Sequence, residues 1–69
     1  MPKITMQAAR VNAGYTQKQL GEKLKVSREL VNAIETGKAE VKPVYLYAFC
    51  HVTGFSEDDI ILPVKSTES

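Results

Sequence analysis

The sequence has little of the chemistry on which enzymes, metal sites and disulfide-linked domains depend. Its 69 residues include one cysteine, Cys50, and one histidine, His51, so they hold neither an internal disulfide nor a cluster with metal-ligand spacing. These two neighbours on a predicted helix point in different directions, which leaves no nucleophile with a partner base. We therefore expect no enzyme, no metal and no other cofactor, and a protein of the reducing cytoplasm.

Long apolar runs are also missing. The longest unbroken one extends from Val44 to Cys50, far short of the roughly 20 residues that a membrane-spanning helix needs. The N-terminus has no signal-peptide pattern. Hydrophobic residues still make up 43% of the chain, which is ordinary for a globular protein, so we expect one small folded domain and no membrane partner.

Neither sign of charge is in large excess, since the net charge is +1. Its distribution is uneven, however: residues 1–42 hold eight Lys and Arg against four Glu, whereas residues 43–69 hold one Lys against four Asp and Glu. This asymmetry indicates that a polyanion would meet the first part of the chain. A scatter of solvated surface charges is the alternative interpretation.

Capping and helix-stopping residues divide the chain into five predicted short helices. Side chains that can cap a helix stand at Thr5, Thr16, Ser27 and Ser56; the fourth helix instead begins at Pro43, with Lys42 as its cap position. Thr16 with Gln19, and Ser56 with Asp59, resemble capping boxes. The expected helices end at Asn12 or Ala13 before Gly14, before Lys25, at Thr36-Gly37, at Gly54, and at Leu62 before Pro63.

No segment shows the alternation of a β-strand. The expected fold class is therefore all-α, a compact bundle of about five short helices. We place the domain at residues 1–64 and expect residues 65–69 to form a disordered tail.

The second and third helices are joined by so short a turn that they must cross closely. Gly21 provides the small residue that such a crossing needs. Apolar residues stand at intervals that suit the contact, at Leu20, Leu24, Val26, Val31 and Ile34. The pair predicts a helix-turn-helix.

The stretch "YTQKQLGEKLKVSRELVNAIETGK" resembles the helix-turn-helix of the XRE family, the group of lambdoid phage repressors and Cro proteins. The specific matches are T-Q-x-x-L from Thr16, V-S at Val26, and I-E-x-G from Ile34, and the similarity extends from about residue 5 to residue 62. The resemblance implies a lambda-repressor-like fold and a DNA-binding transcriptional regulator. It also implies a partly buried ion pair between Arg10 and Glu35.

Two features depart from the family pattern. Lys25 occupies a turn position that is commonly Gly because its φ tends to be positive, and we expect it to cost on the order of 1 kcal/mol. The loop after the third helix, residues 38–42, is often strongly basic in the family, but here it also contains Glu40 and Val41.

The third predicted helix divides into an apolar and a polar arc at about 100° per residue. Leu30, Val31 and Ile34 share the apolar arc and are expected in the core. The outward arc carries the residues expected to contact bases in the major groove: Arg28 to guanine or phosphate, Glu29 to a cytosine amino group, Asn32 to adenine and Ala33 to a thymine methyl. Glu29 could instead only favour the positive end of the helix dipole.

Phosphate contacts are expected from groups at helix N-termini and flanking loops. The candidates are Gln17, Lys18, Ser27, Thr36, Lys38 and Lys42. Each of them could equally be a solvated surface residue.

The fourth predicted helix is apolar nearly all round. Leu46, Phe49 and Cys50 lie on one face, which we assign to the core. The remaining apolar side chains suggest a second cover, plausibly another subunit. The candidate interface residues are Tyr45, Tyr47 and Phe55, and the alternative is that the tyrosines lie along the surface with their hydroxyls in water.

Together these features predict a phage or prophage repressor-like or Cro-like regulator. It would bind a double-stranded DNA operator as a homodimer, at least on DNA. A different class stays open: a small helix-turn-helix modulator, acting like an antirepressor by binding another repressor protein. The low net charge, Glu29, Glu40 and the apolar fourth helix all keep that alternative open.

Overall fold

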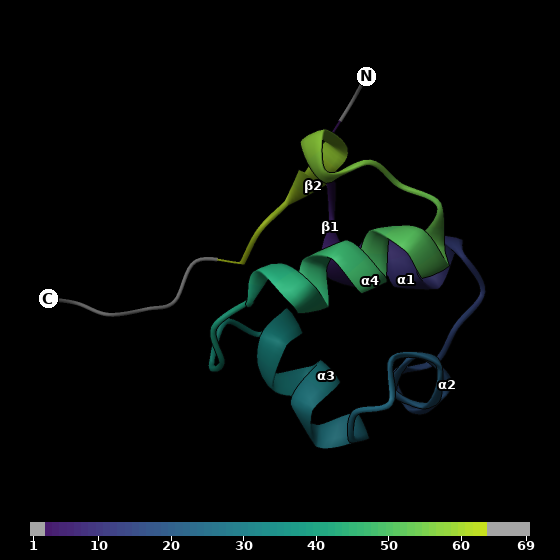
Figure 1. Ribbon diagram of the computed structural model, residues 1–69, viewed down its shortest axis with the longest axis vertical. Coiled ribbons are helices and arrows are strands. Elements are labelled where there is room, and N and C mark those ends of the chain that lie inside the picture. The colour runs from purple at the N-terminus through teal and green to yellow at the C-terminus, as the bar shows by residue number, and fades with distance from the viewer. Residues whose placement is uncertain (1–2, 64–69) are drawn as a thin grey trace, which may run out of the picture.

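Four α-helices and one short pair of strands make up the computed structural model, which describes residues 3–63 (Figure 1). The elements in chain order are β1 (Ile4–Thr5), α1 (Met6–Asn12), α2 (Gln17–Leu24), α3 (Arg28–Glu35), α4 (Pro43–Thr53), the 3-10 turn η1 (Glu57–Asp59) and β2 (Ile60–Ile61). The expected all-α helix-turn-helix class is confirmed. The tail expected at residues 65–69 lies outside the described residues.

Side-chain caps start the first three helices at the positions expected from the sequence. The hydroxyl oxygens of Thr5, Thr16 and Ser27 accept hydrogen bonds from the backbone N–H three residues later, at 3.1, 3.0 and 3.1 Å. The Gln19 side chain also accepts from the Thr16 N–H, which completes a capping box. Pro43 begins α4 without a side-chain cap, and as a residue without an N–H it leaves one fewer donor to satisfy.

The turn between α2 and α3 brings the two helices into close contact. Lys25 ends α2 with φ 62° and ψ 42°. This is the left-handed conformation expected at a turn position that is commonly Gly in the family. Gly21 is buried, and a Cβ atom at this position would lie 2.7 Å from the carbonyl oxygen of Val26. The crossing therefore requires glycine at position 21.

The fifth helix is a wrong prediction, and so is the absence of strands. After Ser56, whose hydroxyl accepts from the Asp58 N–H, the chain makes only the single turn η1. Ile60 then pairs with Ile4 in a parallel register, and the two-stranded sheet forms. These β-branched residues suit strands, but two-residue strands are too short to show an alternating pattern.

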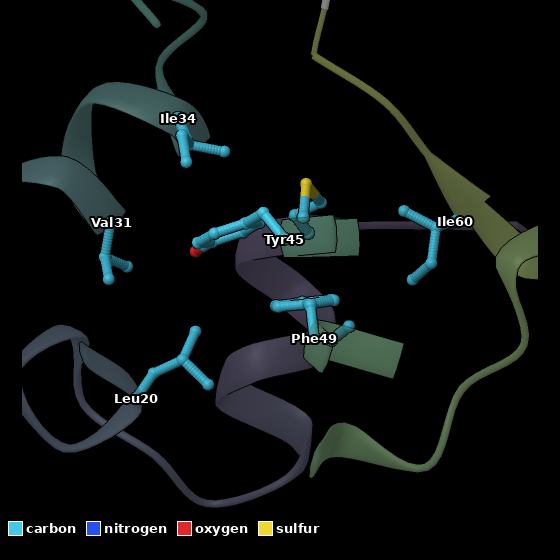
Figure 2. Packing of buried hydrophobic residues seen from close by; sticks show 8 residues of the cluster. Leu20, Val31, Ile34, Tyr45, Phe49 and Ile60 are labelled. Atoms are coloured by element: carbon cyan, nitrogen blue, oxygen red, sulfur yellow. The ribbon is translucent and has the colours of Figure 1, made fainter. Parts of the chain in front are cut away.

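The core lies where α1, α3 and α4 meet α2 and β2. Its buried hydrophobic side chains are Met6, Ala9, Leu20, Val31, Ile34, Tyr45, Phe49 and Ile60. Figure 2 shows the Tyr45 ring pointing from α4 toward Val31 and Ile34, with Ile60 on the far side of α4. The Tyr45 and Phe49 rings stack with centroids 6.3 Å apart.

Two residues lie in an environment that differs from the one predicted from the sequence. Tyr45, a predicted interface residue, is 8% exposed, because α4 turns Tyr45 and Phe49, one helical turn apart, toward the core together. Leu30, a predicted core residue, is 38% exposed, since Val31 and Ile34 fill the core-facing side of α3. Leu46 and Cys50 pack at the edge of the core.

An ion pair joins α1 to α3. The Arg10 guanidinium donates from Nε to Glu35 Oε2 at 2.6 Å and from Nη2 to Glu35 Oε1 at 3.2 Å. A third donor, Nη1, binds the carbonyl oxygen of Tyr15 at 2.8 Å. Both charged side chains are buried, with 8% and 3% of their surface exposed, so the pair is part of the fold rather than of its surface.

Candidate nucleic-acid interface

The outward arc of α3 carries polar side chains on a helix whose opposite side is anchored in the core. Arg28, Glu29 and Asn32 are exposed, Ala33 is partly buried, and Val31 and Ile34 behind them are fully buried. In Figure 1, α2 and α3 occupy the end of the molecule away from β1 and β2. A helix held this way can enter a DNA groove without disturbing the core.

The first turn of α3 presents one positive and one negative side chain. Arg28 Nη2 lies 3.9 Å from Glu29 Oε2, and the two side chains are 62% and 80% exposed. An ion pair this long and this exposed contributes little, so either group is free to turn toward a ligand. The Ser27 hydroxyl accepts from the Leu30 N–H and keeps its own O–H for a phosphate oxygen.

Gln17 on α2 links the buried ion pair to the outward arc. Its Nε2 donates to Glu35 Oε1 at 3.1 Å and to Asn32 Oδ1 at 3.1 Å. Both hydrogens of this amide are thereby used within the protein. A phosphate contact by Gln17 would therefore use its backbone N–H, which is one of the unpaired donors in the first turn of α2.

The other residues expected to contact phosphate differ in whether their side chains are already hydrogen-bonded within the protein. Thr36 Oγ1 donates toward the carbonyl oxygens of Asn32 and Ala33, at 2.9 and 3.3 Å, so a phosphate would have to break that bond. Lys18, Lys38 and Lys42 are exposed. Lys38 follows α3 immediately after the Gly37 turn, and Lys42 stands at the start of α4.

An apolar groove beside α3 is the main feature that sequence reasoning missed. It holds about 280 Å³ and is lined by the apolar residues Leu24, Val26, Leu30, Ile34, Val44, Tyr45 and Ala48 and by the charged residues Glu40 and Lys42. Val44 is 75% exposed there. Two features of the sequence could have indicated it. Leu30 adds a third large apolar residue to the side of α3 on which Val31 and Ile34 already fill the core, and α4 is apolar nearly all round.

The three expected interface residues do not form one surface. Tyr45 lies in the core and also lines the groove, and Phe55 packs partly buried against the core. Tyr47 is 72% exposed and does not line the groove, but it lies three residues after Val44 and is therefore its neighbour on the surface of α4. If α4 contacts a partner through the groove, Tyr47 lies beside that contact.

No metal-binding group or membrane-crossing helix stands out in the part of the chain that the structure describes. Residues 3–63 contain no set of three or more His, Cys, Asp or Glu side chains that could hold a metal ion. None of the helices in this range is both long and apolar enough to cross a membrane. Burial raises the pKa of the Cys50 thiol, and the charge of Glu57 raises it further, so Cys50 stays a protonated, weakly reactive thiol.

Two capped helices crossing at a glycine, with a polar arc facing out of the second, define a helix-turn-helix protein of the DNA-binding class. The model of the Helix-turn-helix family HTH_3 matches residues 6–60, from the start of α1 to the start of β2. The chain belongs to this XRE-family group and is a DNA-binding transcription regulator. No curated protein gives a significant match to the chain.

Proposed function

We propose that the protein is a phage or prophage regulator of the repressor or Cro type, which occupies an operator and excludes polymerase from it. The observation that carries the proposal is the outward arc of α3, where Arg28, Glu29 and Asn32 are exposed on a helix anchored by Val31 and Ile34. With α3 in the major groove, these side chains and Ala33 meet base edges. Arg28 donates to guanine or phosphate, and Glu29 accepts from a cytosine amino group.

Phosphate contacts surround this arc on the proposed complex. The Gln17 backbone N–H and the Ser27 hydroxyl are free donors at the starts of α2 and α3. Lys18, Lys38 and Lys42 add positive charge on either side, while Thr36 is the weakest candidate because its hydroxyl is bound to its own helix. These groups orient the protein without selecting a sequence.

The operator-bound form is proposed to be a homodimer in which the apolar groove of one copy meets that of a second. Leu30 and Val44 stand exposed at the groove, so association would remove apolar surface from water. A two-fold axis brings the same patch of both copies together, so the apolar lining of one groove would pack against the apolar lining of the other.

The second candidate function is modulation of another repressor protein by direct contact. One observation favours it: Glu29, at the front of α3, is 80% exposed and carries the wrong charge for a phosphate backbone. On such a partner, Glu29 would face a basic side chain rather than cytosine.

A selection from random duplex DNA, followed by gel shift of the enriched sequences, separates the two functions. An operator-binding regulator enriches one sequence, which a two-fold symmetric dimer makes palindromic. Recovery of no sequence preference at low salt would reject the operator function and leave the protein-binding one. The low salt matters because phosphate contacts weaken steeply as salt rises.

A further inference from the structure

A directed chain of hydrogen bonds connects the interior of the protein to the outward arc of α3. It begins at Arg10, which can only donate, and passes to Glu35, whose ionised carboxylate can only accept. Glu35 Oε1 then accepts from Gln17 Nε2, and the same nitrogen donates to Asn32 Oδ1. In each hydrogen bond of the chain, the preceding bond determines which group donates and which group accepts.

The direction of the chain follows from the charge of the buried pair. An amide side chain can normally turn over, exchanging its oxygen and its NH2 group at little cost when both find partners. Gln17 cannot do so here, because its oxygen would then face the Glu35 carboxylate, acceptor against acceptor. The Gln17 NH2 is therefore held toward Glu35 and Asn32, and Asn32 must turn its own oxygen inward.

We propose that Gln17 is a specificity-positioning residue, which holds the Asn32 amide with its NH2 group facing the DNA. This rests on the proposed operator function. Held that way, Asn32 presents a donor outward, and within residues 3–63 this NH2 group has no hydrogen-bond partner. It is matched by the N7 acceptor of a purine or the O4 of thymine, and it is opposed by the N4 amino group of cytosine.

The consequence is a selection by exclusion at a single base. A freely turning Asn32 could offer its oxygen to the cytosine amino group and its NH2 to a purine, and would discriminate weakly. The fixed amide leaves a cytosine amino group facing another donor, which is a desolvated and unpaired contact. Cytosine should therefore be the most disfavoured base at the position that Asn32 contacts.

The test measures base preference across the selected operator for three variants. Asn32→Ala identifies the base pair that Asn32 contacts. Gln17→Met keeps a similar side-chain length but removes the amide. Gln7→Met, an exposed glutamine on α1, is the matched control. We expect Gln17→Met to reduce the discrimination against cytosine by about tenfold at the Asn32 base pair, with preferences elsewhere and with Gln7→Met unchanged.

A further variant keeps Gln17 and changes only the buried ion pair, which determines the direction of the hydrogen-bond chain. Arg10→Met combined with Glu35→Gln replaces the buried ion pair with neutral groups, so the amide at position 35 can either donate or accept. We expect the same loss of discrimination against cytosine, provided that circular dichroism shows the native helix content. Full discrimination in this folded double variant would overturn the proposal, because the carboxylate would then not set the direction.

Two further results would count against the positioning role while leaving the operator function intact. An equal loss of affinity for all sequences in Gln17→Met would mean that the Gln17 side chain contacts a phosphate instead of positioning Asn32. Unchanged preference in Gln17→Met would mean that Asn32 needs no support. A wild-type protein without any base preference would instead reject the operator function itself, and the inference with it.

Discussion

The Arg10 guanidinium and the Glu35 carboxylate lie side by side and share two hydrogen bonds, with almost no water access to either. Removing one partner leaves the other charge buried without its counter-ion, so Arg10→Met or Glu35→Gln alone should each lower the free energy of unfolding by about 3–5 kcal/mol. The double variant should cost clearly less than the sum of the two. Urea unfolding of all four proteins gives the coupling energy, and a coupling near zero would show that the pair adds nothing.

The left-handed backbone conformation of Lys25 predicts that glycine at this position stabilises the protein. Glycine adopts this conformation without the steric cost that a Cβ atom brings, so Lys25→Gly should raise the free energy of unfolding by about 1 kcal/mol. Lys23→Gly is the matched control, because Lys23 lies inside α2 and glycine there should cost about 1 kcal/mol. Thermal unfolding measures both, and a lower midpoint for Lys25→Gly would contradict the steric explanation.

Tyr45 should make the fold sensitive to alkaline pH. The pKa of its phenol is raised to about 12, mainly by burial and also by the negative charge of Glu35, with the positive charge of Arg10 opposing the shift. Because the unfolded value is about 10, the folded state holds this proton more tightly; its contribution is fully present below pH about 10 and is lost as the pH approaches about 12. The loss should be on the order of 1–2 kcal/mol.

The Tyr45 effect is measured as the difference between the wild type and Tyr45→Phe in the free energy of unfolding across this alkaline range. Tyr47→Phe, which changes an exposed tyrosine, is the control. The wild type and Tyr47→Phe should lose stability more steeply than Tyr45→Phe. Parallel curves for all three would mean that Tyr45 ionises as easily in the fold as outside it.

Association through the groove predicts different behaviour for an apolar residue inside the groove and one far from it. Val44 lines the groove and is 75% exposed, whereas Val11 is 59% exposed on α1 and does not line the groove. Val44→Glu should therefore shift sedimentation equilibrium toward monomer, whereas Val11→Glu should leave it unchanged. A shift by Val11→Glu alone would move the interface to α1.

DNA binding should respond differently to Arg28 and Lys38. Arg28→Ala removes a base contact, so it should lose about 1–3 kcal/mol on the selected operator and relax the preference at particular base pairs. Lys38→Ala removes a phosphate contact, so affinity should fall for all sequences and the salt slope should flatten by about one unit. Fluorescence anisotropy at several salt concentrations measures both; a uniform loss for Arg28→Ala would place its guanidinium on the backbone.

Local signals made the first three helices predictable from the sequence. Thr5, Thr16 and Ser27 bond to backbone groups only three residues away, and Gly21 and Lys25 act within one turn, so a short window of sequence contains both partners. The polar arc of α3 followed from its strong segregation of polar and apolar residues. The Arg10–Glu35 pair came from family resemblance, since 25 residues separate its members.

The errors have equally specific causes. Because α4 is apolar on nearly every side, its sequence does not indicate which face enters the core, and Tyr45 was placed wrongly. The helical angle of Leu30 puts it on the apolar arc of α3. The core covers only part of that arc, however, and its width is not evident from the sequence, so the exposure of Leu30 could not be predicted. The β1–β2 pair and the Gln17–Asn32 bond depend on the tertiary arrangement, so no sequence window could contain them.

The pairing of Ile4 with Ile60 has a consequence for the order in which the protein folds. The bond closes a loop that contains all four helices, and the entropy lost in closing a loop grows with its length. The contacts between α2 and α3 need only a short loop to form, so they can be made first. We expect the two ends of the described chain to join last in folding and to separate first under a pulling force.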